Sequence, residues 1–323
     1  MRRLGSRLAQ MVFVLWAVAT ILFLIFRLMP GNPLAAYIDP NFTAEQQQEL
    51  MQRFGLDRPL HEQYVRYLGN LLRGDLGDSF FYRAPVTQLI WEVFPNTIAL
   101  TFFALVIAYV VGTLGGIVLA WLRGTWIEGV AIPLVLTTRA APEFWLGMLL
   151  LALFSFSFGW FPSGGANSAG ASFDSELARF FSLDFLRHLF LPATALAIYL
   201  HGLPLLLMRS NMLDVLQEDF VTMAKMKGLS RWTILVRHAA RNALLPVVTA
   251  FAVGIGYSIG GNVVIETVFS WPGLGRLLVR AVSASDYPLA QGAFLVIATV
   301  IVVMNFIADM LYSTLDPRVA HER

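Results

Sequence analysis

Apolar runs bounded by charged residues divide this chain into long segments. Five of the runs contain no Asp, Glu, Lys or Arg: residues 8–26, 97–122, 189–208, 242–265 and 287–308. Each is about 19 to 26 residues long, and a helix needs roughly 20 residues to cross the hydrocarbon core of a bilayer. A sixth run, 127–158, is apolar but interrupted by Pro133, Arg139, Pro142 and Glu143. The pattern predicts an all-α polytopic membrane protein with six transmembrane helices.

The composition agrees with lipid as the solvent. Hydrophobic residues make up 57% of the 323 residues and charged residues 14%, whereas an ordinary soluble domain has roughly 45–50% apolar residues even with glycine counted. The absence of cysteine excludes disulfides, thiolate metal sites and cysteine nucleophiles, and it leaves the redox compartment unreadable. A net charge of +2 gives no electrostatic support for nucleic-acid binding.

The distribution of charge predicts the orientation. Three arginines precede the first run: Arg2, Arg3 and Arg7. The run is longer than the core of a typical signal peptide, and no small-residue cleavage site follows it before Arg27, so we expect an uncleaved span over 8–29 rather than the alternative, a cleaved signal peptide. The positive-inside rule then keeps the N-terminus cytoplasmic, and six spans return the C-terminus to the same side. Residues 30–96, with eight carboxylates and five arginines, and the Gly- and Ser-containing loop 159–186 are expected outside.

The predicted outer segment, residues 30–96, is expected to be a small helical cap. Thr43-Ala44-Glu45-Gln46 resembles a capping box, and Gly55 can end the helix that follows it. Pro59 suits the first turn of a second helix that reaches about Arg73. The segment is therefore expected to be ordered.

A polar loop, residues 209–241, separates the fourth and fifth spans and contains both of the chain's lysines. Five side chains step by three or four residues along one helical face: Leu213, Leu216, Phe220, Met223 and Lys227. Gly228 is placed to stop this helix in the left-handed conformation, and Ser230 can cap a second helix beginning at Arg231. The loop is predicted to form two short helices on the cytoplasmic face.

Short motifs follow one another in order along nearly the whole chain. They are Pro30-Gly31-Asn32-Pro33, Gly55-Leu56-Asp57-Arg58-Pro59, Gly74-Asp75-Leu76-Gly77, Glu266 to Arg276, Asp286-Tyr287-Pro288 and Asp316-Pro317-Arg318. The polar loop adds Ala224 to Ser230 and Arg237 to Pro246. Together they resemble the membrane-spanning subunits of ABC importers, and most closely the B-type permease of the dipeptide and oligopeptide branch. Where the general family has Glu-Ala-Ala before the glycine, this chain has Thr222-Met223-Ala224, and Pro246 lies farther from Gly228 than in the general motif.

The resemblance implies a type I ABC importer permease fold. Residues 1–323 would form one transmembrane domain, with 97–313 as a five-helix core. The first short helix of the polar loop would be the coupling helix, which docks on a cytoplasmic ATPase. The residues expected to carry this coupling are Glu218, Phe220, Ala224, Lys225, Lys227, Gly228, Leu229 and Ser230. The alternative, on physical grounds, is an amphipathic helix that lies on lipid headgroups.

ATP chemistry is assigned to other polypeptides. A Walker motif needs Gly-x-x-x-x-Gly-Lys followed by Ser or Thr, but the chain's two lysines precede Met226 and Gly228. The resemblance implies that partner subunits bind the ATP and Mg, so this chain is expected to be a transport subunit and not an enzyme. The implied partners are a second, C-type permease, two cytoplasmic ATP-binding subunits and an extracytoplasmic substrate-binding protein, in a bacterial or archaeal inner membrane. The default cargo is a short peptide; relatives in this branch also carry glutathione, nickel chelates or haem, and the sequence does not choose among them.

Four residues inside the spans are candidates for the translocation pathway: Arg139, Glu143, Gly256 and Gly260. Charges at that depth face a cavity or one another, so the alternative for the first two is a local ion pair beside Pro142. For the glycines the alternative is close helix packing. The motif from Trp271 to Gly275 is expected to form an outer turn, which either borders the exit or has no contact with cargo.

Two other classes of function were weighed. A stand-alone secondary transporter or channel is supported only by the six spans and the pair Arg139 and Glu143. An intramembrane serine protease would need Ser258 and His201 as a dyad, and nothing in the sequence brings them together. The histidines give no metal site, because His61-Glu62 begins like a zinc-protease motif but position 65 is valine.

Overall fold

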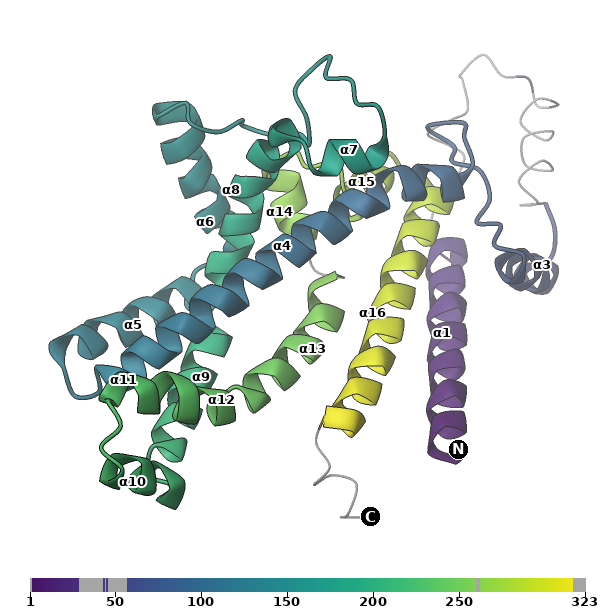
Figure 1. The fold of residues 1–323 in the computed structure, drawn as a ribbon. Coiled ribbons are helices and arrows are strands. Elements are labelled where there is room, and N and C mark those ends of the chain that lie inside the picture. Colours follow the sequence, from purple (N-terminus) through teal and green to yellow (C-terminus); the bar gives the residue numbers. More distant parts are fainter. Residues whose placement is uncertain (1, 29–42, 44, 46–56, 260–261, 316–323) are drawn as a thin grey trace. The chain divides into compact units, whose positions relative to one another are not determined.

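The computed structural model describes residues 2–28, 43, 45, 57–259 and 262–315. Within these residues the regular elements are helices, and the β-contact is an isolated bridge between Asp78 and Pro85. The chain forms two compact units, shown in Figure 1: an N-terminal unit, Met1–Thr97 with Pro272–Val302, and a central unit, Ile98–Trp271 with Val303–Arg323. Each unit is described separately.

The N-terminal unit contains the first span and the short helix α3 that follows it. Its elements are α1 (Arg2–Leu28), α3 (Leu60–Leu72), the first turns of α4 (Val86–Trp121), α15 (Leu274–Ser283) and the first part of α16 (Tyr287–Leu315). The buried ring of Phe23 on α1 contacts Tyr64 and Tyr67 on α3, with centroid distances of 5.3 and 5.4 Å. Thr20 and Tyr64 share a hydrogen bond of 2.8 Å between their hydroxyls. The helix α3 is therefore fastened to the first span.

A buried carboxylate organises the segment before α4. Asp286, at the start of α16, accepts hydrogen bonds from the hydroxyl of Ser79 at 2.5 Å and from the backbone N–H groups of Phe80 and Phe81 at 3.1 Å. It also accepts from the N–H of Leu289 at 3.3 Å, which caps α16. A fully buried carboxylate is stable only when its oxygens are paired in this way. The Asp286 motif found in the sequence thus closes the loop onto α16.

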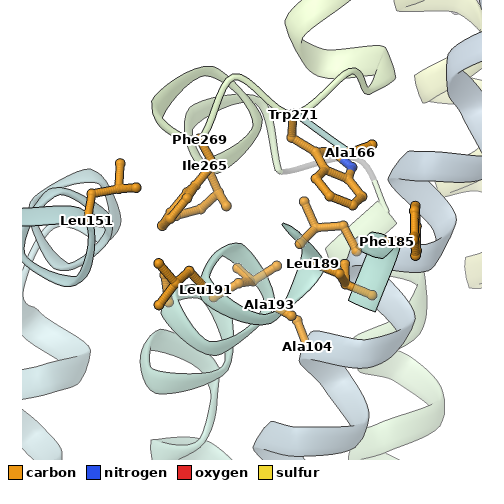
Figure 2. Close-up of a cluster of buried hydrophobic side chains, with 13 residues drawn as sticks. Ala104, Leu151, Ala166, Phe185, Leu189, Leu191, Ala193, Ile265, Phe269 and Trp271 are labelled. Atoms are coloured by element: carbon orange, nitrogen blue, oxygen red, sulfur yellow. The ribbon is translucent and has the colours of Figure 1, made fainter. Parts of the chain in front are cut away.

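The central unit contains the remaining helices. They are α5 (Trp126–Ala140), α6 (Glu143–Leu150), the π-helix η1 (Leu151–Ser157), α7 (Glu176–Phe180), α8 (Leu183–Leu200), α9 (Gly202–Val215), α10 (Asp219–Met226), α11 (Arg231–Thr233), the π-helix η2 (Ile234–Ala239), α12 (Ala240–Ala243), α13 (Leu245–Ile259) and α14 (Val263–Val268). Figure 2 shows one core cluster, in which the indole of Trp271 lies beside Phe185 at a centroid distance of 5.5 Å. Because Trp271 is fully buried there, its side chain belongs to the core.

The described helices match most of the expected spans but do not establish their number. Four helices are long and apolar enough to cross a membrane: α1, α4, α8 and α16. The run 127–158 forms α5 followed by α6 and η1, bent by 103°. The bend follows from Pro142, because Ala141 before it takes extended dihedrals (φ −66°, ψ 140°). In the run 242–265, α13 and α14 flank residues 260–261, which lie outside the described part, so the count of six stays a prediction.

Two boundaries differ from expectation. The helix α4 begins at Val86 and not at residue 97, so the long helix extends eleven residues before the apolar run. The run 189–208 forms two helices, α8 and α9, that meet at His201, because Pro204 has no N–H to continue the helical ladder. The helix predicted from Pro59 to about Arg73 is confirmed as α3. The capping box at Thr43 and the stop at Gly55 lie outside the described residues, apart from Thr43 and Glu45 themselves.

Glycines allow α4 and α9 to touch through their backbones. A Cβ added at Gly116 would lie 2.6 Å from the carbonyl oxygen of Leu205 and 2.7 Å from the Cβ of Met208. A Cβ at Gly112 would lie 2.8 Å from the carbonyl oxygen of His201. Small residues four apart are the common device for close helix packing in lipid, where dispersion replaces the hydrophobic effect as the driving force.

We predict that Gly116→Ala lowers the free energy of unfolding by about 1–3 kcal/mol, because the methyl group overpacks a backbone contact that cannot yield. The matched control is Gly129→Ala on α5, where nothing lies within 4 Å of the added methyl. Thermal unfolding midpoints in detergent should fall for the first variant and stay level or rise for the second. Equal midpoints in the two variants would contradict the close contact.

Candidate functional site

The polar loop folds as a helical hairpin, which we define as residues 218–234. The helix α10 begins after Glu218 and ends at Met226; Lys227 is its C-cap, and Gly228 after it adopts a positive φ of 74°. The N–H of Leu229 then bonds the carbonyl of Ala224 at 3.3 Å, closing the end of α10. Ser230 caps α11 by accepting the N–H of Thr233 at 3.2 Å. The two-helix geometry predicted from the sequence is confirmed.

The buried face of the hairpin differs from the predicted one. Val221, Ala224 and Ile234 are buried together, with Leu216 and Phe220 packed beside them. The expected apolar face included Met223, but its side chain is 57% exposed. After the turn, the chain runs back through α11 and η2 and places Ile234 against α10. The face of α10 that contains the small residue Ala224 is therefore the one that is buried. Ala224 is only 5% exposed, and its small size admits η2.

Large apolar side chains remain exposed on the hairpin. They are Met223, Met226, Leu229 and Trp232, of which Met226 is 78% exposed. The other predicted coupling residues Glu218, Lys225, Lys227, Gly228 and Ser230 are also exposed, whereas Phe220 is half-buried. Exposed apolar groups among charges are typical of a docking surface, because burial against a partner removes them from water.

The hairpin is attached to the membrane helices at both of its ends. On the N-terminal side α9 leads into it through Leu216, which packs against the hairpin core. On the C-terminal side Leu235, Ala239 and Ala243 pack with Met212 of α9 in a second buried cluster. Figure 1 shows α10 at the end of this arrangement, beyond α9, α11 and α12. A force on α10 is therefore transmitted to α9 and to the chain that enters α13.

An ion pair joins α5 to α9, the helix that leads into the hairpin. Arg209 donates from Nε to Oε1 of Glu128 at 2.7 Å and bonds the same oxygen through Nη2. The second carboxylate oxygen accepts the N–H of Gly124 at 2.6 Å. Only 10% of the glutamate side chain and 24% of the arginine side chain are exposed. The sequence analysis missed this pair, although Thr125 followed by Glu128 is a capping-box pattern that marks the helix start.

The pathway candidates are not brought together. Arg139 near the end of α5 is exposed and Glu143 at the start of α6 is half-buried. They lie on either side of the 103° bend, and the ion pairs found between described residues do not include one joining them. The aliphatic stem of Arg139 packs on Gly202, where an added Cβ would meet its Cδ at 3.5 Å. Gly256 lies within α13, and Gly260 lies outside the described residues.

The serine and histidine of the protease alternative are not joined by the structure. His201 Nδ1 is engaged with the carbonyl oxygen of Ile198 at 2.6 Å, at the junction of α8 and α9. Ser258 lies on α13, in the stretch whose side chains the structure leaves undescribed. The dyad therefore has no support in the described residues.

Comparison with known proteins gives the family. Residues 112–321 match the family described as binding-protein-dependent transport system inner membrane component, and residues 1–101 match its N-terminal family model. The chain belongs to this family of transport permeases. The fold agrees: a chain of the MetNI methionine ABC transporter superposes with a TM-score of 0.54 at 14% identity, covering 71% of this permease and 97% of that chain.

Curated relatives match the permease over its whole length. The di/tripeptide transport system permease protein DppB of Pseudomonas aeruginosa (strain UCBPP-PA14) is 36% identical and covers 99% of each chain. A putative peptide transport system permease protein of Brucella abortus (strain 2308) is 39% identical over 98% of each. The dipeptide transport system permease protein DppB of Alkalihalophilus pseudofirmus is 33% identical over 98% of each. The resemblance to ABC importer permeases inferred from the motifs is confirmed.

We predict that Glu128→Gln lowers the free energy of unfolding, because it leaves the guanidinium of Arg209, which is 24% exposed, without its counter-charge. The control is Glu176→Gln, which removes the partner of Arg179 from a pair whose glutamate is 78% exposed and which should cost about 0–1 kcal/mol. Thermal midpoints in detergent measure both. A double variant, Glu128→Leu with Arg209→Met, should recover much of the loss, and equal effects of the two single variants would refute the bracing role.

Proposed function

We propose that this permease is the membrane-spanning subunit of an ATP-driven importer that, together with a second permease, forms the translocation pathway for short peptides. The peptide assignment is supported by full-length relatives named as peptide permeases. In this proposal an extracytoplasmic binding protein delivers the peptide, and two cytoplasmic subunits bind and hydrolyse ATP with Mg. The single observation that carries the coupling role is the rigidly attached hairpin with an exposed, partly apolar α10.

The charge pattern supports an orientation with the hairpin and both termini in the cytoplasm of a bacterium or archaeon. Arginines precede the first span, and basic residues dominate the hairpin and its return. Counting α1, α4, the bent pair of α5 with α6 and η1, and the α8 to α9 run as one crossing each, four crossings precede α10. An even number of crossings returns the chain to the side on which it began.

The docking surface proposed for the ATPase consists of residues on the exposed side of α10 and its turn. Met223 and Met226 are its apolar anchors, and Lys225, Lys227 and Leu229 flank them. Methionine is flexible and polarisable, which suits a contact that must persist while two bodies rotate against each other. Ala224 and Gly228 have structural roles in this proposal. The small side chain of Ala224 lets η2 pack against α10, and Gly228 adopts the positive φ that the turn requires.

Transport in this proposal is alternating access. Closure of the ATPases on nucleotide draws α10 and its counterpart in the second permease together, and the attached α9 and α13 tilt with them. Nucleotide biases two arrangements of the same bundle, so its binding energy must differ between them. Arg139 and Glu143, together with Gly256 and Gly260, remain proposed pathway residues, and Arg139 on its Gly202 platform would give the cargo a cationic contact.

The absence of cysteine makes α10 testable by single-cysteine crosslinking. Met226→Cys should crosslink to a co-expressed ATPase subunit, because the side chain is 78% exposed, whereas Ala224→Cys at 5% exposure should not. Crosslinking of Met226→Cys to lipid alone would contradict docking. Equal crosslinking at the two positions would contradict the packing of the hairpin.

The second test measures transport. Met223→Asp with Met226→Asp should reduce ATP-dependent peptide uptake by at least about tenfold, since buried interface anchors each contribute more than roughly 1 kcal/mol. Leu177→Asp on α7 is the control, because its side chain is similarly exposed but distant in the chain from the hairpin. Uptake by vesicles that contain the permease alone and no ATP would favour a stand-alone transporter or channel instead.

A further inference from the structure

A cavity of about 280 Å³, with charged and aromatic residues in its lining, lies within the N-terminal unit. It is lined by the end of α1, one side of α3, the loop before α4 and the start of α16. Three arginines and two aspartates are among its lining residues: Arg27, Arg58, Arg66, Asp75 and Asp78. None of these residues belongs to the hairpin or to the pathway candidates, so the coupling function leaves the cavity without a role.

The cavity is at the level where two membrane spans end. Arg27 lies in the last turn of α1, and Tyr287 is the first residue of α16. Phe26 and Tyr287, both in the lining, have ring centroids 5.8 Å apart. Arginine and aromatic rings at a span terminus are typical of the boundary between hydrocarbon and headgroups. The cavity therefore opens where phospholipid headgroups reside.

Polar atoms without partners lie in the cavity wall. The hydroxyl of Tyr67, Oε1 of Gln63 and Nε2 of Gln291 are buried without a hydrogen bond of ordinary geometry among the described residues, although the amide of Gln291 lies near enough to the Tyr67 hydroxyl to offset part of the rise in its pKa. Burial raises the pKa of Tyr67 to about 12, so its hydroxyl stays protonated at neutral pH and can donate. Two donors and one acceptor thus await a ligand that offers both kinds of group, since leaving such atoms unpaired is costly.

The cavity lining contains both positive and negative side chains, so it suits a ligand that carries charges of both signs. Arg66 takes part in none of the ion pairs found between described residues, and Arg58 has a solvent-exposed pair with Glu62 at 3.6 Å. Guanidinium groups bind phosphate oxygens in a charge-assisted, bidentate manner. Asp75 and Asp78 supply carboxylates of the kind that bind an ammonium group. A phosphate joined to a primary amine by a short linker meets both requirements.

We propose that this cavity binds the headgroup of an aminophospholipid, with its phosphate on the arginines and its ammonium on the aspartates. The acyl chains would follow α1, where Ile21, Ile25 and Leu28 form an exposed apolar stripe ending beside Arg27. A short zwitterionic peptide offers the same charges, but it has no use for this stripe. The assignment of this lipid to the outer leaflet rests on the orientation given under the proposed function. The binding of the lipid does not depend on that orientation.

The test is native mass spectrometry of the full-length permease, delipidated and then titrated with phosphatidylethanolamine or phosphatidylglycerol. One phosphatidylethanolamine should bind per chain, and Arg66→Gln should weaken it on the order of tenfold, the effect of losing one charge-assisted contact. The control Arg73→Gln removes the same charge from the same region outside the lining and should change nothing. Equal losses in the two variants would overturn the proposal in favour of general surface charge.

The remaining arms separate the possible sources of the ligand. Asp78→Asn should reduce the preference for phosphatidylethanolamine over phosphatidylglycerol while leaving phosphate binding in place; an unchanged preference would contradict the ammonium contact. Glycerophosphoethanolamine should displace the lipid only at much higher concentration, and displacement at equal concentration would indicate a site for free phosphoesters. A dipeptide that displaces the lipid in wild type but not in Arg66→Gln would identify a peptide site instead. The crosslink of Met226→Cys to the ATPase should be the same in all variants, so failure here is distinct from failure of the coupling role.

Discussion

Backbone hydrogen bonding governs this structure, because a chain in hydrocarbon has no water to satisfy its N–H and C=O groups. The chain therefore stays helical and interrupts its helices only where a specific residue makes the interruption tolerable. At the bend after α5, the N–H of Ala141 still bonds the carbonyl of Thr137 at 2.9 Å, and Pro142 has no N–H to satisfy. At the junction of α8 and α9, the N–H of Leu205 bonds the carbonyl of His201, again beside a proline. The points at which the chain changes direction within the bundle are thus set by a few residues, such as Pro142 and Pro204.

Between these points the helices are held by contacts of two kinds. Backbone contact through Gly112 and Gly116 draws α9 against α4, and the ion pair of Arg209 with Glu128 holds α9 to the start of α5. The hairpin continues directly from α9, and Met212 of α9 packs with the helices on its far side. The element that faces the proposed ATPase is therefore joined to the membrane helices by packed side chains rather than by a flexible linker.

The turn of the hairpin could be predicted from neighbouring residues, whereas the buried face of α10 depends on tertiary packing. Gly228 and Ser230 were placed correctly because a left-handed stop and a hydroxyl cap depend on a few neighbouring residues. The buried face of α10 was wrong because two apolar stripes were available, and only the return of Ile234 selects the one with Ala224. The helix α4 begins before the apolar run that marked it, and Glu92 in these added turns is exposed on the helix and bonded to Gln88. The ion pair of Glu128 joins residues far apart in sequence, so only its capping pattern was visible beforehand.

The contact at Gly116 has a mechanical consequence. Since Gly116 lies against the carbonyl of Leu205 and the Cβ of Met208, with no flexible side-chain end between the helices, α4 and α9 resist sliding along each other. A tilt imposed on one must carry the other, and α4, at 36 residues, is the longest helix that the structure describes. Because of the close contact at Gly116, a small displacement of the hairpin moves α9 and the long helix α4 together.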